Sequence, residues 1–102
     1  MTHRLLLLDD HPVFRDSLAW FLRRDHYDVH SVADGDEAAT LLRRTHFDLV
    51  ITDREHPGMA EDRICELSER CIVLTCSWQE DGVHKGVPIE DFLEHVKQVL
   101  AN

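Results

Sequence analysis

Short apolar runs alternate with amphipathic segments along the chain. The apolar runs span residues 4–9, 27–32, 47–52 and 71–75. Each is short and is bounded by acidic or turn residues, which favours β-strands. The segments between them repeat apolar residues three and four positions apart, which predicts helices with one buried face. We expect these helices over residues 12–25, 36–44, part of 59–70, and from Pro88 to the end of the chain.

Strand and helix alternate four times, which is the pattern of an α/β fold. The first, third and fourth predicted strands are apolar throughout, as in a parallel sheet that carries helices on both faces. The sequence therefore predicts a doubly wound parallel sheet. In such sheets ligands bind beyond the carboxyl ends of the strands, so the chemistry of the protein is expected there.

Acidic and hydroxyl side chains stand where the predicted strands end. Asp9 and Asp10 close the first strand, Asp53 the third and Thr75 the fourth. Three carboxylates on one rim repel one another unless a cation lies between them, and hard oxygen ligands favour Mg²⁺. A carboxylate beside such an ion can attack phosphorus and form an aspartyl phosphate. Each acid alone is better explained as a solvated loop residue; their combination favours chemistry.

Composition narrows the classes of function. The chain has 102 residues, the size of one domain, and a formal net charge of −9. Because it has no basic tract, direct nucleic-acid binding is not expected. No stretch is long and apolar enough for a membrane span or a signal peptide. We expect one cytoplasmic domain, residues 1–102, without an output domain.

The cysteines and histidines do not predict a zinc site. Cys65, Cys71 and Cys76 are odd in number and lack metal-binding spacing, which predicts reduced thiols in a cytoplasmic protein. None of the eight histidines stands at zinc-site spacing from another ligand.

Three motifs, in this order and spacing, resemble the receiver domain of bacterial two-component response regulators. Residues 5–12 (Leu-Leu-Leu-Leu-Asp-Asp-His-Pro) resemble its first strand and acidic pair. Residues 47–53 (Phe-Asp-Leu-Val-Ile-Thr-Asp) with 57–59 (Pro-Gly-Met) resemble its third strand, phosphoacceptor and following loop. Residues 73–75 (Val-Leu-Thr) resemble its fourth strand and hydroxyl. The resemblance implies a flavodoxin-like, CheY-like fold and a histidine kinase or phosphotransfer protein as partner.

The resemblance also implies roles in phosphoryl transfer. Asp53 would accept the phosphoryl group, and Thr75 would donate a hydrogen bond to it. Lys85 matches the family's lysine, although the proline that follows it, Pro88, comes two residues late. Such a domain is not an enzyme, beyond catalysing its own phosphorylation and dephosphorylation.

The cofactor that the resemblance implies is Mg²⁺. Its protein ligands would be Asp53, Asp10, Asp9 through a water molecule, and the backbone carbonyl of Glu55. The three aspartates are the same strand-end acids that suggested a cation from their charge alone.

The resemblance fails between Thr75 and Lys85. Only nine residues, 76–84, lie there. A fourth helix and a fifth strand with their connections need about 24 residues. We therefore expect helix 4 and strand 5 of the receiver fold to be shortened or missing. Gly82 stands where the family has an aromatic switch residue, so the usual coupling of that aromatic to the threonine is not available.

A shortened fifth strand has a consequence for assembly. The outer edge of strand 71–75 would be exposed, and such edges pair with other chains. The apolar stripe of the last helix would lose part of its packing surface. A symmetric homodimer would cover both surfaces, in one form with the terminal helix exchanged between protomers.

Three functions are open at this point. The first is a stand-alone receiver phosphorylated on Asp53, and the second is a non-switching interaction or dimerisation module on a degenerate receiver scaffold. The third is a phosphohydrolase with an aspartate nucleophile. Such an enzyme needs a second acid two residues after the nucleophile, and Glu55 stands two residues after Asp53. The third is disfavoured because 102 residues leave no room for a cap domain.

Overall fold

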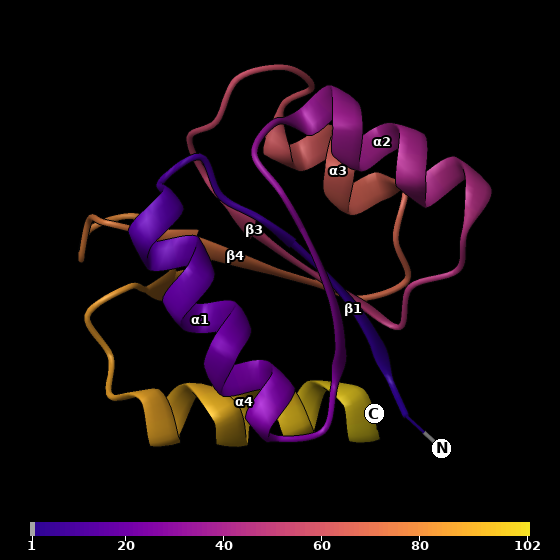
Figure 1. Ribbon diagram of the computed structural model, residues 1–102. Coiled ribbons are helices and arrows are strands. Elements are labelled where there is room, and N and C mark those ends of the chain that lie inside the picture. The colour runs from indigo at the N-terminus through magenta and orange to yellow at the C-terminus, as the bar shows by residue number, and fades with distance from the viewer. Residues whose placement is uncertain (1) are drawn as a thin grey trace.

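The computed structural model describes residues 2–102 as a five-stranded sheet with helices on both faces (Figure 1). The strands are β1 (Arg4–Leu8), β2 (Asp28–Val32), β3 (Leu49–Asp53), β4 (Cys71–Thr75) and β5 (Val83–His84). The helices are α1 (Pro12–Arg24), α2 (Gly35–Arg44), α3 (Glu61–Glu66) and α4 (Ile89–Ala101). The strand order is β2-β1-β3-β4-β5 and every neighbouring pair is parallel, which confirms the predicted doubly wound sheet.

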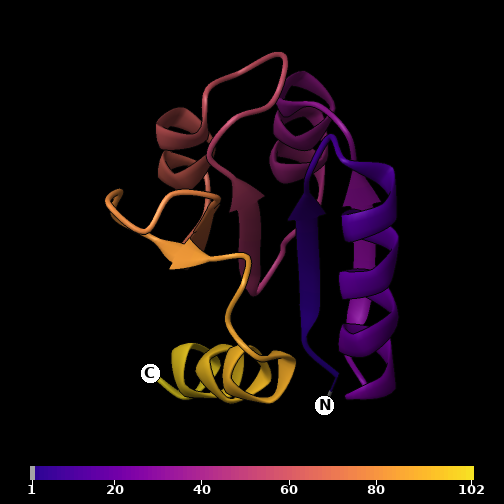
Figure 2. The ribbon, with the colours of Figure 1, turned by 90° about the vertical axis from the view of Figure 1, so that its left-hand side faces the viewer.

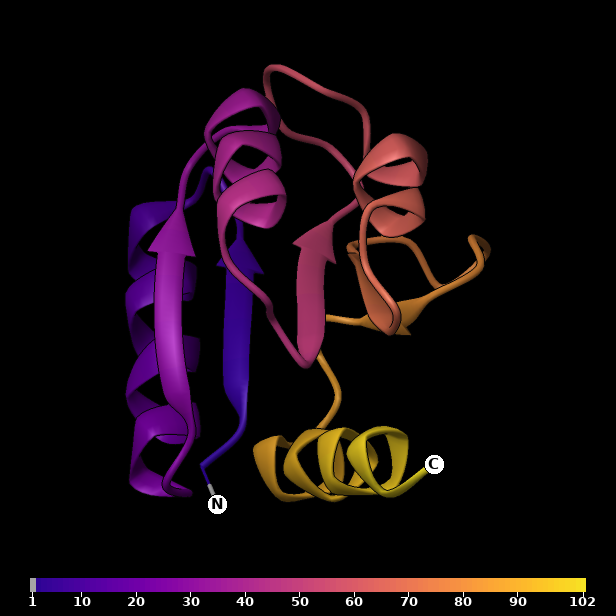
Figure 3. The ribbon, with the colours of Figure 1, turned by 90° about the vertical axis from the view of Figure 1, so that its right-hand side faces the viewer.

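The two faces of the sheet bury different side chains of the same strand. In β1, Leu5 and Leu7 belong to the core beneath α1 and α4, while Leu6 and Leu8 belong to the core beneath α2 and α3. Successive side chains of a strand point to opposite faces, so a strand covered on both faces must be apolar at every position. Figures 2 and 3 show these two layers, with α4 lying across the end of the sheet near the N-terminus.

Local sequence explains where two of the helices begin. α1 starts at Pro12, whose missing N–H costs nothing at a first helical position. α2 starts after Asp34, whose side chain accepts a hydrogen bond from the Glu37 amide, as an N-cap residue does. Within residues 2–102 no helix is long and apolar enough to cross a lipid bilayer.

The chain between β4 and β5 contains no helix in the described structure. Residues 76–82 form bends and one turn, and β5 has only two residues, which pair with Leu74 and Thr75. The outer edge of β4 from Cys71 to Val73 has no strand partner within the described residues. Val83 and His84 add this short strand to the edge of the sheet. That this region is a shortened form of the receiver fold stays a prediction.

The expectation of three reduced cysteines is wrong for two of them. Cys65 in α3 and Cys71, the first residue of β4, form a disulfide with their Cα atoms 5.4 Å apart. The third, Cys76, is free and exposed. An odd number of cysteines and an unfamiliar spacing argued against pairing. The turn that follows α3 nevertheless returns the chain so that these two side chains meet.

Candidate functional site

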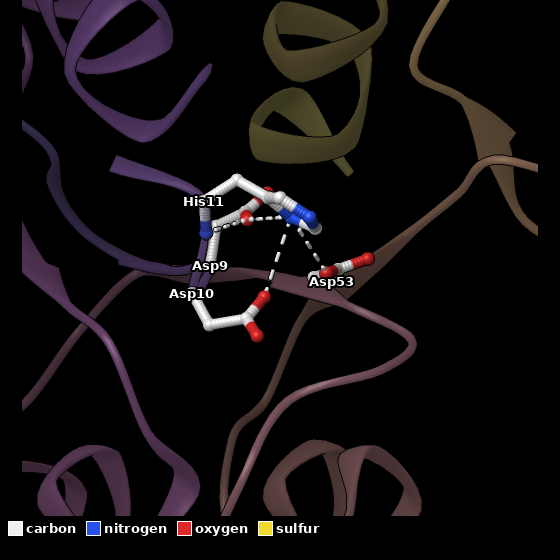
Figure 4. Close-up of side chains that lie close together, drawn as sticks. All are labelled: Asp9, Asp10, His11 and Asp53. Carbon is white, nitrogen blue, oxygen red and sulfur yellow. Dashed lines mark hydrogen bonds and ion pairs between the residues drawn. The ribbon is translucent and has the colours of Figure 1, made fainter. Parts of the chain in front are cut away.

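The carboxyl ends of the central strands bring the predicted acids together. Asp9 follows β1 and Asp53 ends β3, and both are buried, while Asp10 is exposed. One ligand atom from each of Asp9, Asp10, His11 and Asp53 lies within 4.8 Å of the others. Figure 4 shows the carboxylates of Asp10 and Asp53 and the His11 ring converging on this point.

Lys85 supplies a positive charge to the buried acids. Its Nζ atom lies 2.8 Å from Oδ2 of Asp9 and 3.4 Å from Oδ2 of Asp53, and its side chain is only 11% exposed. Lys85 directly follows β5, and its amide donates a hydrogen bond to the carbonyl oxygen of Thr75. The ammonium also lies 4.6 Å from the centre of the Phe14 ring. The short β5 is therefore sufficient to place Lys85 in the site, despite the late proline.

Burial and charge shift the pKa values of this group in a consistent way. Burial raises the pKa of Asp53; Lys85 opposes this shift and the charge of Asp9 adds to it. Burial alone would lower the pKa of Lys85, but its hydrogen bond to Asp9 and the charges of Asp9 and Asp53 outweigh burial and raise that pKa. One ammonium therefore pairs with two buried carboxylates, Asp10 adds a third carboxylate to the cluster, and the excess negative charge favours a further cation.

His11 is a residue of the site to which the sequence analysis gave no role. Its Nδ1 atom lies 3.3 Å from an oxygen of Asp9, 3.3 Å from one of Asp10 and 3.9 Å from one of Asp53. Its backbone N–H donates a hydrogen bond to Oδ1 of Asp9 at 2.9 Å, at the start of α1. The signal that could have found it is its position directly after the acidic pair.

A cavity of about 200 Å³ opens beside Asp53. It is lined by residues from three strand ends and the following loops: His11, Asp53, Arg54, Glu55, Thr75, Cys76, Ser77 and Glu80. Since one ordered water needs only about 10–15 Å³, this cavity has room for a phosphoryl group and for water molecules. Thr75 is buried at its wall.

The structure brings the side chains of four predicted site residues together. The side chains of Asp9, Asp10, Asp53 and Lys85 meet as described, whereas the carboxylate of Glu55 is not part of the acidic cluster. Glu55 lies on the cavity wall, and the expected role of its backbone carbonyl as a ligand stays a prediction. Oxygen ligands from three carboxylates fit a hard divalent cation such as Mg²⁺.

Arg54 and Glu80 are further residues of the cavity that the sequence analysis missed. Nε of Arg54 lies 3.1 Å from Oε2 of Glu80, and Nη1 lies 3.5 Å from Oε1 of Glu61. The third guanidinium nitrogen, Nη2, donates a hydrogen bond to the carbonyl oxygen of Asp81. Arg54 directly follows Asp53, and this adjacency is the only signal in the sequence. No signal in the sequence points to Glu80, because its position depends on the path of residues 76–82.

Comparison with known proteins identifies relatives in two-component signalling. The DNA-binding response regulator MtrA of Mycolicibacterium smegmatis is 34% identical over 67 residues, which are 66% of this chain and 29% of that protein. The sensor histidine kinase AruS of Pseudomonas aeruginosa is 30% identical over 93 residues, 91% of this chain and 8% of that protein. The chain thus spans less than a third of the length of either relative.

Solved structures show the same fold. The receiver domain of the sensor histidine kinase PA1611 from Pseudomonas aeruginosa, solved with a magnesium ion in its active-site cleft, has a TM-score of 0.87 at 22% identity and covers 100% of both chains. A CheY-like receiver domain from Methanospirillum hungatei has a TM-score of 0.86 at 22% identity and covers 99% of this chain and 95% of its own. The family model described as the response regulator receiver domain matches residues 5–88. This chain therefore belongs to the response regulator receiver family.

Proposed function

We propose that this receiver domain accepts a phosphoryl group on Asp53 from a histidine kinase or a phosphotransfer protein, with Mg²⁺ as cofactor. The observation that carries the proposal is the buried Asp53 carboxylate, which lies beside Lys85 and opens onto a cavity walled by Thr75. Two relatives of this chain are a DNA-binding response regulator and a sensor histidine kinase, and both belong to such signalling systems. A stand-alone role in the cytoplasm stays a prediction.

The transfer would use the ionised form of Asp53. One of its oxygen atoms attacks the phosphorus of a phosphorylated histidine; a P–O bond forms as the P–N bond breaks, and the electron pair of that bond stays on the imidazole nitrogen. Lys85 and the Thr75 hydroxyl would donate hydrogen bonds to the phosphoryl oxygens. Mg²⁺ held by Asp9, Asp10, Asp53 and the Glu55 carbonyl would supply positive charge to the same oxygens.

Phosphorylation of Asp53 can be tested without the cognate kinase. Incubation of the protein with acetyl phosphate and Mg²⁺ is expected to add the mass of one phosphoryl group, measured by intact-protein mass spectrometry. Chelation of Mg²⁺ is expected to remove most of this product. The Asp53→Asn variant lacks the nucleophile and is expected to gain no mass.

A matched control keeps this test specific. Asp16 lies on α1 with its side chain 76% exposed, and Asp16→Asn removes the same charge without touching the site. This variant is expected to be phosphorylated like the wild type. If neither the wild type nor Asp16→Asn gains a phosphoryl group, the domain is instead a non-switching interaction module on a receiver scaffold.

We also infer that two copies of the chain associate through the outer edge of β4. β5 covers only Leu74 and Thr75, and the uncovered part of β4, Cys71 to Val73, carries no charge. An unpaired, uncharged strand edge favours pairing with another strand, and a twofold axis would join two identical edges. Exchange of the terminal helix is not needed for its burial, because Phe92 and Val96 of α4 already lie in the core of their own chain.

Light scattering tests this association. At high micromolar concentration the wild type is expected to have the mass of two chains. Val73→Lys places a charge on the β4 edge and is expected to shift the protein to the monomer. Val13→Lys, at an α1 position that is 81% exposed, is expected to leave the dimer intact. A wild type that is monomeric over the whole concentration range would contradict the inference.

A further inference from the structure

The segment between β4 and β5, residues 76–82, is attached to the site by polar contacts at several points. We call it the β4–β5 loop. The Ser77 amide donates a hydrogen bond to Oγ1 of Thr75 at 3.0 Å, and the Gln79 amide donates to Oγ of Ser77 at 3.2 Å. The carbonyl oxygen of Asp81 accepts a hydrogen bond from Arg54. These contacts hold the loop beside the cavity that Asp53 faces, although the loop contains no helix.

The carboxylate of Glu80 connects two residues of this cavity. The Thr75 hydroxyl donates to Oε1 of Glu80 at 3.5 Å, and Nε of Arg54 lies 3.1 Å from Oε2. Glu80 thus brings a negative charge from the loop to the hydroxyl that is expected to bind the phosphoryl group. Its side chain is 45% exposed, so it can leave this position for solvent without rearrangement of the core.

We propose that Glu80 occupies the place beside Thr75 that a phosphoryl group on Asp53 requires, and that its displacement carries the phosphorylation signal into the β4–β5 loop. The proposal rests on the proposed phosphorylation of Asp53. A threonine hydroxyl has one hydrogen to donate, so Glu80 and the phosphoryl group compete for it. A phosphoryl group adds about 1.5 to 2 negative charges at neutral pH, which repel a carboxylate in the same cavity.

Arg54 determines what happens to the loop when Glu80 leaves. Its guanidinium has five donors, and it also contacts Glu61 of α3 and the Asp81 carbonyl. It therefore keeps partners after it loses Glu80, while the loop loses one of its attachments to the cavity. Gly82 stands in place of the aromatic switch residue of the family, so the signal has to leave through the loop itself.

Trp78 is the residue through which a change in the β4–β5 loop can reach the surface. Its side chain is 74% exposed and its ring stacks on His84, with centroids 3.5 Å apart and planes at 7°. Nε2 of His84 donates to the Cys76 carbonyl at 2.9 Å, and Nδ1 accepts from the Gly86 amide at 2.8 Å. His84 also precedes Lys85, so Trp78 rests on a residue next to the second phosphoryl-binding group. A change in the loop is therefore expected to change the surroundings of Trp78.

The test compares two variants that each remove one negative charge from the loop. Glu80→Gln keeps the shape of the side chain but weakens its contact with Arg54. Asp81→Asn changes the neighbouring residue, whose side chain has no hydrogen bond or ion pair within residues 2–102. Both are made with Trp20→Phe, which leaves Trp78 as the only tryptophan of the chain. Phosphorylation by acetyl phosphate with Mg²⁺ and the emission of Trp78 are then measured.

Glu80→Gln is expected to be phosphorylated about two to ten times faster than Asp81→Asn, because its neutral amide does not repel the phosphoryl group and is held less tightly by Arg54; the factor is in the range of one polar contact. Before phosphorylation its Trp78 emission is expected to lie closer to that of the phosphorylated parent, and the Ser77 amide is expected to exchange faster with solvent. The same urea midpoint for both variants would show that these effects are local.

The outcomes separate the two proposals. If the parent is phosphorylated on Asp53 but the two loop variants have the same rate and emission, the role of Glu80 is overturned and the proposed function stands. A Glu80→Gln variant that is phosphorylated more slowly than Asp81→Asn also overturns that role, because Glu80 would then assist the transfer. If the parent is not phosphorylated at all, both proposals fail together.

Discussion

Replacement of Lys85 by methionine is expected to lower the free energy of unfolding by about 3 kcal/mol at pH 7 and to remove most phosphorylation of Asp53. Methionine keeps the length of the side chain and removes its charge. The carboxylates of Asp9 and Asp53 would then stay buried without the ammonium that lies 2.8 and 3.4 Å away. Loss of one partner of a buried ion pair costs about 3–5 kcal/mol, and the value expected here is at the lower end because Lys85 is 11% exposed.

The effect of Lys85→Met is expected to depend on pH in a defined way. The pKa of Lys85 is raised in the folded protein, so its stabilising contribution is fully present below the ordinary lysine value of 10.5 and is lost as the pH rises through the folded value. At acidic pH the variant regains the lost stability, because its buried carboxyl groups become protonated and no longer need a positive partner. The raised pKa of Asp53 means that this recovery begins above the ordinary aspartate value of 3.8.

Urea unfolding followed by circular dichroism, between acidic pH and pH 11, measures this profile. Lys97→Met is the matched control, because the Lys97 side chain is 69% exposed and, among residues 2–102, pairs only with Glu94 on the same helix. Its effect is expected to stay below about 0.5 kcal/mol at every pH. Mg²⁺ is expected to stabilise Lys85→Met more than the wild type, since a cation can replace the lost charge. Equal stability of the two lysine variants would show that Lys85 does not stabilise the buried charges of Asp9 and Asp53.

The sheet and the acidic rim could be predicted because they depend on local pattern and topology. A strand such as 4–8, apolar at every position, requires helices on both faces, and parallel strands bring their carboxyl ends to one rim. The positions of Asp9 and Asp53 at this rim follow directly from that rule. The place of Lys85 does not, because nine residues of loop and short strand precede it, and only the family resemblance suggested its role.

The contacts that could not be predicted depend on the path of irregular chain. The turn after α3 joins Cys65 to Cys71, and the β4–β5 loop brings Glu80 to Arg54. Neither segment has a periodic pattern from which its path could be calculated. The packing of α4 is an intermediate case. Its apolar stripe was evident in the sequence, and its own chain buries part of it: Phe92 and Val96 are buried, whereas Leu93, Val99 and Leu100 are only partly buried.

Phe92→Ala is expected to lower the free energy of unfolding by about 3–5 kcal/mol, the usual cost of truncating a buried phenylalanine. Phe92 is 4% exposed and belongs to the core cluster that includes Leu74 of β4 and Leu18 of α1. Its removal would leave a cavity where α4 meets the sheet. Phe92, Lys85 and Phe14 also line one apolar pocket. The substitution is therefore expected to loosen the packing that holds the Lys85 side chain in place.

Two readouts distinguish this packing role from a general loss of helix. Val13→Ala, at an α1 position that is 81% exposed, is expected to cost less than about 0.5 kcal/mol in the same urea experiment. Phe92→Leu restores most of the apolar volume and is expected to recover more than half of the loss, together with the phosphorylation rate. If Phe92→Ala were no less stable than Val13→Ala, α4 would not pack on its own chain. Exchange of this helix between protomers would then be expected again, because the apolar stripe of α4 still has to be buried.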